Sequence, residues 1–293
     1  MLERLCIIGV GLIGGSVAKA ARALGLAREI VGVDLSLETL RQAQALGVVD
    51  AGYMNAAEGV HEADGVVIAV PVGRMQAILA ALAPVWSQQA FYTDAGSTKV
   101  STVKAAQAVF GKVPANFVPA HPIAGRELSG VEAASADLFQ GRRVILTPMS
   151  STSARVLERV RAFWQGLGGE VHVMSAAHHD HVLAATSHLP HVVAYALTHL
   201  LGRKDEQDEI FRYAAGGFKD FTRIASSDPE MWADICLANA GEILTFVHRF
   251  ERELAAVREL IARADRQALL DYFGEARAAR QRFLEQSREK PCK

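Results

Sequence analysis

LCIIGVGLIGGSVAKA, residues 5–20, joins an apolar run to a glycine-rich turn and then to a helix-forming segment. The apolar run predicts a buried strand, and the segment after the turn predicts a helix. Three glycines shape the turn: Gly9 permits its tightness, Gly11 lets a pyrophosphate approach the backbone, and Gly14 lets helix and strand pack closely. The helix N-terminus offers N–H groups and a partial positive charge to phosphates. The pattern predicts a dinucleotide site, against a purely structural turn or a methyltransferase-type loop.

An acidic residue lies at the distance that such a site requires. A second predicted strand, Glu29–Val33, ends at Asp34, twenty residues after Gly14. A carboxylate there can accept both ribose hydroxyls of an adenosine, and it repels a 2′-phosphate. The nearest following arginine, Arg41, is expected to face solvent on a helix. The pattern favours NAD, with NADP as the less favoured cofactor. The residues assigned to cofactor binding are Gly9, Gly11, Leu12, Ile13, Gly14, Asp34, Val70 and Ser97.

Composition excludes several classes of partner. The chain has 293 residues, of which 50% are hydrophobic and 22% charged, and its net charge is −1. This balance gives no electrostatic basis for binding nucleic acid or an anionic membrane. Apolar runs stay shorter than the roughly 20 residues of a membrane span, and the start of the chain leaves no room for a signal peptide. Three widely spaced cysteines (Cys6, Cys236 and Cys292) indicate free thiols in a reducing compartment, so a cytoplasmic protein is expected.

Strand and helix patterns alternate in the first half of the chain. The predicted strands are Leu5–Val10, Glu29–Val33, Val66–Val70, Ala90–Thr93, Phe117–Ala120, Val144–Leu146 and Glu170–Met174. The predicted helices between them are Ser16–Leu24, Leu37–Leu46, Arg74–Leu82, Ser101–Val109 and Ser153–Gln165. This alternation predicts an α/β fold, with a doubly wound, mostly parallel sheet of the Rossmann type over residues 1–174.

Beyond Ser175, which is expected to cap a helix, the pattern becomes entirely helical. The predicted helices are Asp180–Leu201, Glu206–Ala214, Glu230–Ile261 and Arg266–Glu285, with breaks at Gly216-Gly217 and before Pro229. Residues 175–293 are therefore predicted to form an all-α domain. The stretch Met231–Ile261 is long for a globular helix, which suggests packing against a second subunit, although a long intramolecular helix fits the pattern equally well.

Four segments contain side chains suited to chemistry beside a nicotinamide. His121 follows a predicted strand and precedes a proline, which suits a general acid or base. Residues 94–99, DAGSTK, follow another strand end and serve either as a helix cap or as a ligand site. Residues 178–191 hold five histidines. A metal site there is disfavoured, because paired cysteines and an HExxH helix are missing. Arg223 can grip a carboxylate with two parallel hydrogen bonds, or form a surface ion pair.

Together these blocks resemble the prephenate dehydrogenase family, also called cyclohexadienyl dehydrogenases. The resemblance spans nearly the whole chain and rests on motifs in a fixed order. These motifs are GVGLIGGS (residues 9–16), GSTK (96–99), HPIAGRELSG (121–130), LFQG (138–141), LTP (146–148), HD (179–180), SHLPH (187–191) and DFTRIA (220–225) with Trp232. The glycine turn is common to many dehydrogenases, whereas the combination is specific.

The resemblance implies a reaction and a set of site residues. It implies an NAD-dependent oxidative decarboxylation in tyrosine biosynthesis, with His121 accepting the proton of the substrate's 4-hydroxyl group and Ser97 orienting His121. A neutral His121 is then required, so activity should fall as the pH drops through its pKa. The substrate-binding residues implied are Arg223, Ser187, His191, Glu127, His179, Lys219 and Trp232. It also implies a homodimer formed through the C-terminal helices.

Three alternatives stay open at the level of sequence. Prephenate and arogenate differ by a keto and an amino group on the side chain, and the sequence singles out no acid for the ammonium. A β-hydroxyacid or ketopantoate-type dehydrogenase also joins a Rossmann half to a helical half, but it would need Lys219 as acid and base and would leave His121 unexplained. A nucleotide-binding sensor without turnover would not need Ser97, His121 and Arg223 together.

Overall fold

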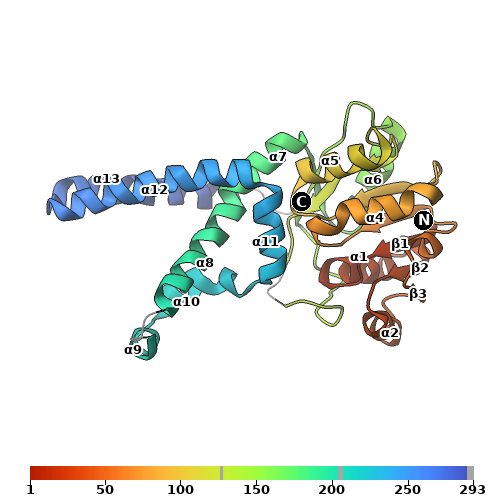
Figure 1. Cartoon of the computed structure of the whole chain (residues 1–293), viewed down its shortest axis with the longest axis horizontal. Helices are drawn as coiled ribbons and strands as arrows, with labels where there is room; N and C mark the ends of the chain where they lie inside the picture. Colours follow the sequence, from red (N-terminus) through yellow and green to blue (C-terminus); the bar gives the residue numbers. More distant parts are fainter. Residues whose placement is uncertain (126–127, 204–206, 289–293) are drawn as a thin grey trace. The chain divides into compact units, whose positions relative to one another are not determined.

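The computed structural model describes residues 1–125, 128–203 and 207–288 (Figure 1). The chain divides into two compact units, Met1–Glu242 and Ile243–Lys293. Among the described residues, no helix is both long enough and apolar enough to cross a membrane.

The first unit is built on a six-stranded parallel sheet with the strand order β3-β2-β1-β4-β5-β6. Its strands are β1 (Leu2–Ile8), β2 (Ala27–Val33), β3 (Ala51–Tyr53), β4 (Gly65–Ile68), β5 (Phe91–Asp94) and β6 (Phe117–Val118). The strand order changes direction between β1 and β4, and sheets of this kind bind ligands outside the carboxyl ends of the strands at that point. The predicted doubly wound, mostly parallel α/β fold is confirmed.

Helices cover both faces of this sheet, because alternate residues of a strand point to opposite faces. Leu5 and Ile7 of β1 belong to one core, and Cys6 and Ile8 belong to the other. The first core includes residues of α1 (Leu12–Ala23), α2 (Leu37–Ala45) and α6 (Ala154–Gly166); the second includes residues of α3 (Ala56–Gly59), α4 (Met75–Leu82) and α5 (Lys99–Phe110). Burial on both faces explains why the inner part of β1, residues 5–8, is an uninterrupted apolar run, whereas Glu3 and Arg4 lie at its less buried start.

A second sheet of three strands follows, and it corrects one prediction. Its strands are β7 (Ala120–Pro122), β8 (Arg143–Leu146) and β9 (Glu170–Val173), with β7 antiparallel and β9 parallel to β8. The single strand expected over Phe117–Ala120 was wrong, because the chain leaves the first sheet at Pro119. Proline lacks the N–H that would continue the ladder, and its carbonyl accepts from Thr147 N at 2.8 Å in the second sheet. His121 therefore lies within β7, opposite Ile145.

The helical part of the first unit begins at the expected cap. The Ser175 side chain accepts from His178 N at 3.2 Å and starts α7, and the Asp228 side chain accepts from Met231 N at 2.8 Å, with Pro229 in the first turn of α11. The helices are α7 (Ala176–Leu183), a π-helical turn (Ala184–His188), α8 (Leu189–Gly202), α9 (Gln207–Arg212), α10 (Gly216–Thr222) and α11 (Pro229–Ala238). Short 3₁₀ turns are η1 (Val72–Arg74), η2 (Ala83–Val85) and η4 (Arg223–Ser226).

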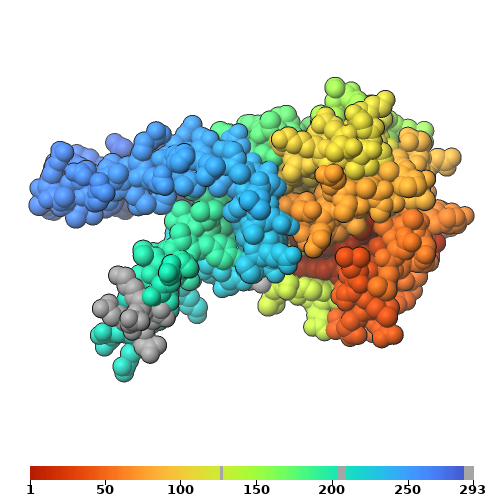
Figure 2. Space-filling view, in the orientation of Figure 1, coloured from red at the N-terminus to blue at the C-terminus, as the bar shows by residue number. Residues whose placement is uncertain are grey.

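Helix α11 packs against η1 of the sheet layer (Figure 2), and Gly73 N donates to Asp234 Oδ2 at 3.2 Å. The single helix expected over Glu230–Ile261 was wrong, because Asn239 separates α11 from α12 (Ala240–Ala262). In the second unit, α12 continues to Ala262 and α13 (Arg266–Arg288) follows, with a hydrogen bond from Tyr272 OH to Glu253 at 3.0 Å. The domain boundary predicted after residue 174 coincides with the change from strands to helices. The compact units divide instead after residue 242, so the predicted domain boundary stays a prediction.

Candidate active site

The glycine turn between β1 and α1 has the geometry of a phosphate cradle. Gly9 has φ of +90°, a conformation that glycine adopts without strain. A Cβ on Gly14 would lie 1.9 Å from the Gly9 carbonyl oxygen, so any side chain would push α1 away from β1. Above Gly11 there is open space for 4 Å, and this N-cap residue has no side chain that could bond the first N–H groups of α1. These unblocked donors and this space fit the pyrophosphate of a dinucleotide.

Asp34 lies at the end of β2, beside the same turn. Its carboxylate accepts from Val10 N at 3.1 Å and from Ser36 N at 3.0 Å, and the side chain is partly exposed. Arg41 is exposed. Val70 follows β4 and lies against Gly9. The structure thus gathers Asp34 and Val70 around the turn that their predicted cofactor role requires.

A buried ion pair fixes the residue that precedes His121. Asp94 ends β5 and Lys99 starts α5, and both side chains are fully buried and in contact with each other. Asp94 also accepts from Ala120 N and from Gly96 N, each at 2.9 Å, while Lys99 Nζ donates to Ala120 O at 2.6 Å. Both backbone polar groups of Ala120 are therefore held by charged side chains. This clamp joins the carboxyl end of β5 to β7.

His121 belongs to a hydrogen-bonded series of three side chains. Nδ1 of His121 lies 2.8 Å from Nε2 of His179, and Nδ1 of His179 lies 2.7 Å from Oδ1 of Asp180. The Asp180 carboxylate also accepts from Lys99 N at 2.7 Å and from Val100 N at 2.9 Å. These two groups are the first N–H donors of α5, so a carboxylate from α7 caps α5. Nδ1 of His121 thus shares its hydrogen bond with His179. The orienting role expected for Ser97 stays a prediction.

Burial keeps the histidines of this cluster neutral. The pKa of His121 lies well below its usual 6.5, because of burial first and then of the charges of His179, Lys99 and His188. Burial likewise lowers the pKa of His179, which the hydrogen bond to Asp180 opposes. Burial lowers the pKa of His188 to about 4, and it lowers the pKa of His191. An unprotonated imidazole at neutral pH can accept a proton.

The π-helical turn arranges a second group of side chains. Asn239 Nδ2 donates to Nδ1 of buried His188 at 3.2 Å and to Asp180 O at 2.9 Å. One turn later the His191 ring stacks on Trp232, with 3.7 Å between ring centroids, and its Nδ1 bonds the Ser187 carbonyl at 2.9 Å. π-Helical turns occur often at functional sites, because they change which side chains share a helix face. The predicted residues Ser187, His191 and Trp232 thus lie together.

Other predicted residues lie on neighbouring elements. Lys219 on α10 and Arg223 at η4 are exposed, and both elements pack against α8, the helix that carries His191. Ser97 is partly exposed between β5 and α5. Glu127 falls outside the described residues. From the sequence, residues 94–99 are either a cap or a ligand site, and no separate role follows for Asp180 or Asn239. The bonds that hold these two residues to Lys99 and His188 join positions more than fifty apart.

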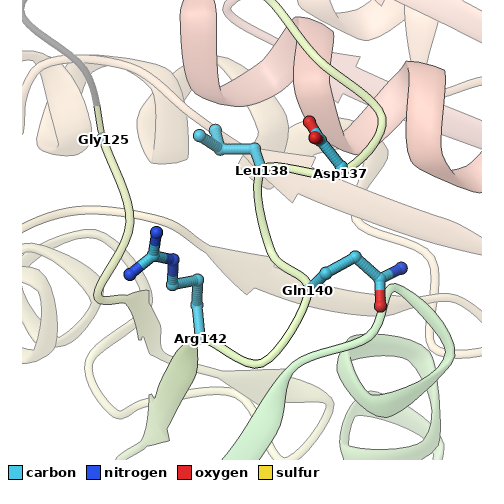
Figure 3. A pocket seen from close by; sticks show the side chains of 5 residues that line it. All are labelled: Gly125, Asp137, Leu138, Gln140 and Arg142. Atoms are coloured by element: carbon cyan, nitrogen blue, oxygen red, sulfur yellow. The ribbon is translucent and has the colours of Figure 1, made fainter.

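A separate polar pocket of about 390 Å³ opens beside the segment that follows β7 (Figure 3). It is lined by Gly125, Asp137, Leu138, Gln140 and Arg142, none of which is a predicted site residue. Over the described ranges 1–125, 128–203 and 207–288, no three His, Cys, Asp or Glu side chains are grouped so as to hold a metal ion.

His188 makes the stability of the fold depend on pH. Its pKa falls from 6.5 to about 4 on folding, so between these values the unfolded chain binds a proton that the folded protein does not. As the pH decreases through this window, the free energy of unfolding should therefore decrease too. For this residue the decrease should be about 2 kcal/mol between about pH 7 and pH 5. The measurement is urea unfolding at both pH values and at fixed protein concentration. Between pH 7 and pH 5, the free energy of unfolding of His188→Gln should decrease less than that of wild type.

The control for this measurement is His178→Gln, because His178 is exposed on α7. That variant should lose as much stability between the two pH values as wild type does. If His188→Gln also retained the full wild-type pH dependence, His188 would not be the group that links protonation to unfolding.

Comparisons with known proteins show which family the chain is similar to. Residues 17–173 match the family model for the prephenate dehydrogenase nucleotide-binding domain, and residues 175–275 match the model for the prephenate dehydrogenase dimerization domain. Cyclohexadienyl dehydrogenase from Zymomonas mobilis is 40% identical over 96% of this chain and 96% of its own length. Prephenate dehydrogenase from Bacillus subtilis is 37% identical over 94% of this chain and 75% of its own length.

A solved structure is similar over the whole fold. The crystal structure of prephenate dehydrogenase from A. aeolicus, in complex with hydroxyphenyl propionate and NAD⁺, has a TM-score of 0.90 and 38% identity. The match covers 97% of this chain and 99% of that chain. Two family models that together span most of the sequence, and relatives of this similarity, lead to one conclusion: the chain belongs to the prephenate dehydrogenase family.

Proposed function

We propose that this protein oxidises and decarboxylates prephenate with NAD, giving 4-hydroxyphenylpyruvate, and that arogenate is a second substrate giving tyrosine. Family membership supports the reaction, as do the names of relatives that act on prephenate or cyclohexadienyl compounds. The observation that carries the proposal is the neutral His121, fixed by a clamp to the carboxyl end of β5. In such sheets this is the edge at which a bound dinucleotide meets its substrate.

In the proposed reaction, the hydride passes to the cofactor and His121 accepts the proton. Bound NAD supplies the acceptor for the hydride that leaves C4 of the substrate. His121 takes the proton of the 4-hydroxyl group as its oxygen becomes a carbonyl. The bond between the ring and its carboxylate then breaks, CO₂ leaves, and the released electron pair completes the aromatic ring. Aromatisation drives the step, so the protein need only position the substrate and hold an unprotonated base.

The substrate's polar groups are assigned to the remaining predicted residues. Arg223 is proposed to bind a substrate carboxylate, assisted by Lys219 and Glu127, and Ser97 to contact the hydroxyl. Ser187, His191, His179 and Trp232 are proposed to line the side-chain end. The stacked His191 and Trp232 rings support this, because they offer an apolar surface with a polar edge.

Cofactor choice, assembly and location complete the proposal. We infer NAD over NADP because the Asp34 carboxylate lies beside the glycine turn. We infer a homodimer through the C-terminal helices and a cytoplasmic location. The dimer is supported by the exposed apolar side chains of α12 and α13, namely Leu254, Ile261, Leu270 and Phe273, and by the match to a dimerization domain.

The test is the appearance of NADH absorbance with purified protein at neutral pH. Prephenate and arogenate are each supplied with NAD and, in parallel, with NADP. Rapid reduction of NAD with prephenate is expected, and the ratio of the two rates gives the side-chain preference. NADP should support much slower turnover. If neither substrate produced NADH although NAD still bound, the proposal would be overturned and a β-hydroxyacid dehydrogenase would be favoured.

A further inference from the structure

The series His121–His179–Asp180 restricts where protons can lie. A carboxylate only accepts hydrogen bonds, so Nδ1 of His179 must carry the proton shared with Asp180. Burial keeps His179 neutral, and a neutral imidazole has one donor and one acceptor nitrogen. Nε2 of His179 is therefore an acceptor. Nδ1 of His121, 2.8 Å away, must then donate, which leaves Nε2 of His121 with its lone pair.

The starting point of this series is firmly fixed. The Asp180 side chain is almost fully buried, and it receives three hydrogen bonds, from His179, Lys99 N and Val100 N. Burial alone would raise the pKa of Asp180, but these hydrogen bonds outweigh it and the pKa is lowered. The Asp180 carbonyl is also held, by Asn239. The carboxylate is thus ionised, and it is held at both its side chain and its backbone.

We propose that Asp180 is a positioning residue that, through His179, keeps the proton of His121 on Nδ1 and leaves Nε2 as the base. The role of Nε2 as the base rests on the function proposed above. The position of the proton on Nδ1 is a property of the substrate-free protein. When Nε2 takes the hydroxyl proton, the resulting imidazolium still donates from Nδ1 to His179. No second proton has to move, and Asp180 stays ionised.

The direct test is ¹⁵N NMR of the full-length, substrate-free protein with labelled histidine. The ¹⁵N shift separates a ring nitrogen that carries a proton from one that does not, and the His121 signals are identified by their loss in His121→Asn. The wild type should show a protonated Nδ1 and a bare Nε2. In Asp180→Asn the tautomers should become mixed. A proton on Nε2 of wild-type His121 would overturn the inference, whether or not the protein acts on prephenate.

A second test separates positioning from packing at His179. In His179→Gln, the amide oxygen can take the place of Nε2 and accept from His121, whereas the leucine of His179→Leu cannot accept. We expect His179→Leu to lower kcat by about 100-fold, within the usual range of general acid–base effects. The kcat of His179→Gln should be at least about 10-fold higher than that of His179→Leu. Equal losses in the two variants would contradict the proposal, as would a change in KM alone.

The chain supplies a matched control for the carboxylate. His181, on the exposed side of α7, forms a histidine–carboxylate pair with Glu242 of α12, with 2.7 Å between Nδ1 and Oε2. Glu242→Gln makes the same chemical change as Asp180→Asn at a pair that does not reach His121. Its kcat and its His121 signals should match wild type. A drop in kcat as large as that of Asp180→Asn would show that the effect is not specific to the series.

Discussion

His121→Asn is expected to lower kcat by about 10²- to 10⁴-fold, the usual contribution of a general base, and to leave NAD binding intact. Asparagine is too short to place an acceptor where Nε2 lies, and its amide cannot take up a proton. The glycine turn and Asp34, which carry the predicted cofactor contacts, are separate from β7. The measurements are kcat with prephenate and the Kd of NAD. His178→Asn, the same change at an exposed histidine, should match wild type.

The pH profile gives an independent check on His121. Its pKa is lowered, and the groups that face it are Lys99, His179 and His188, with Asp94 and Asp180 behind them. Because the base must be unprotonated, kcat/KM should stay level as the pH falls to 6.5, the usual value for histidine. It should decline only at lower pH. A decline centred above 6.5, or turnover by His121→Asn near the wild-type rate, would remove His121 from the role of base.

The parts of the fold that the sequence predicts are those that local pattern controls. The glycine turn, the cap at Ser175 and the proline start of α11 each depend on residues a few positions apart, and all three are present. A strand buried on both faces is equally local, since it appears as a continuous apolar run. These features need no knowledge of distant segments.

The missed features depend on contacts between distant residues. The break at Asn239 has no proline, and Gly241 lies two residues beyond it. The Asn239 side chain bonds Asp180 and His188, more than fifty positions earlier. The end of the first sheet at Pro119 requires knowing that Thr147 lies beside it. In the same way, the bond between His121 and His179 joins two separately predicted segments. Spacing along the chain identified the histidines as candidates but not their partners.

Lys99→Met is expected to lower the free energy of unfolding by about 3–5 kcal/mol, the usual cost of leaving a buried charge without its partner. Asp94 would remain buried with only the two N–H groups of Gly96 and Ala120 to stabilise its charge. The measurement is urea unfolding at neutral pH and fixed protein concentration. Arg28→Met is the matched control, because Arg28 pairs with Glu3 at 2.8 Å on the exposed surface. It should cost less than about 1 kcal/mol.

The double variant Lys99→Met with Asp94→Asn decides whether the cost comes from charge. Removing both charges leaves no buried ion, so the double variant should be more stable than the sum of the single losses predicts. Its kcat should nevertheless stay low, because methionine cannot donate to the Ala120 carbonyl that Lys99 holds next to His121. Additive losses would show that Lys99 acts through packing alone. Recovery of full activity would show that β7 holds His121 in place without the clamp.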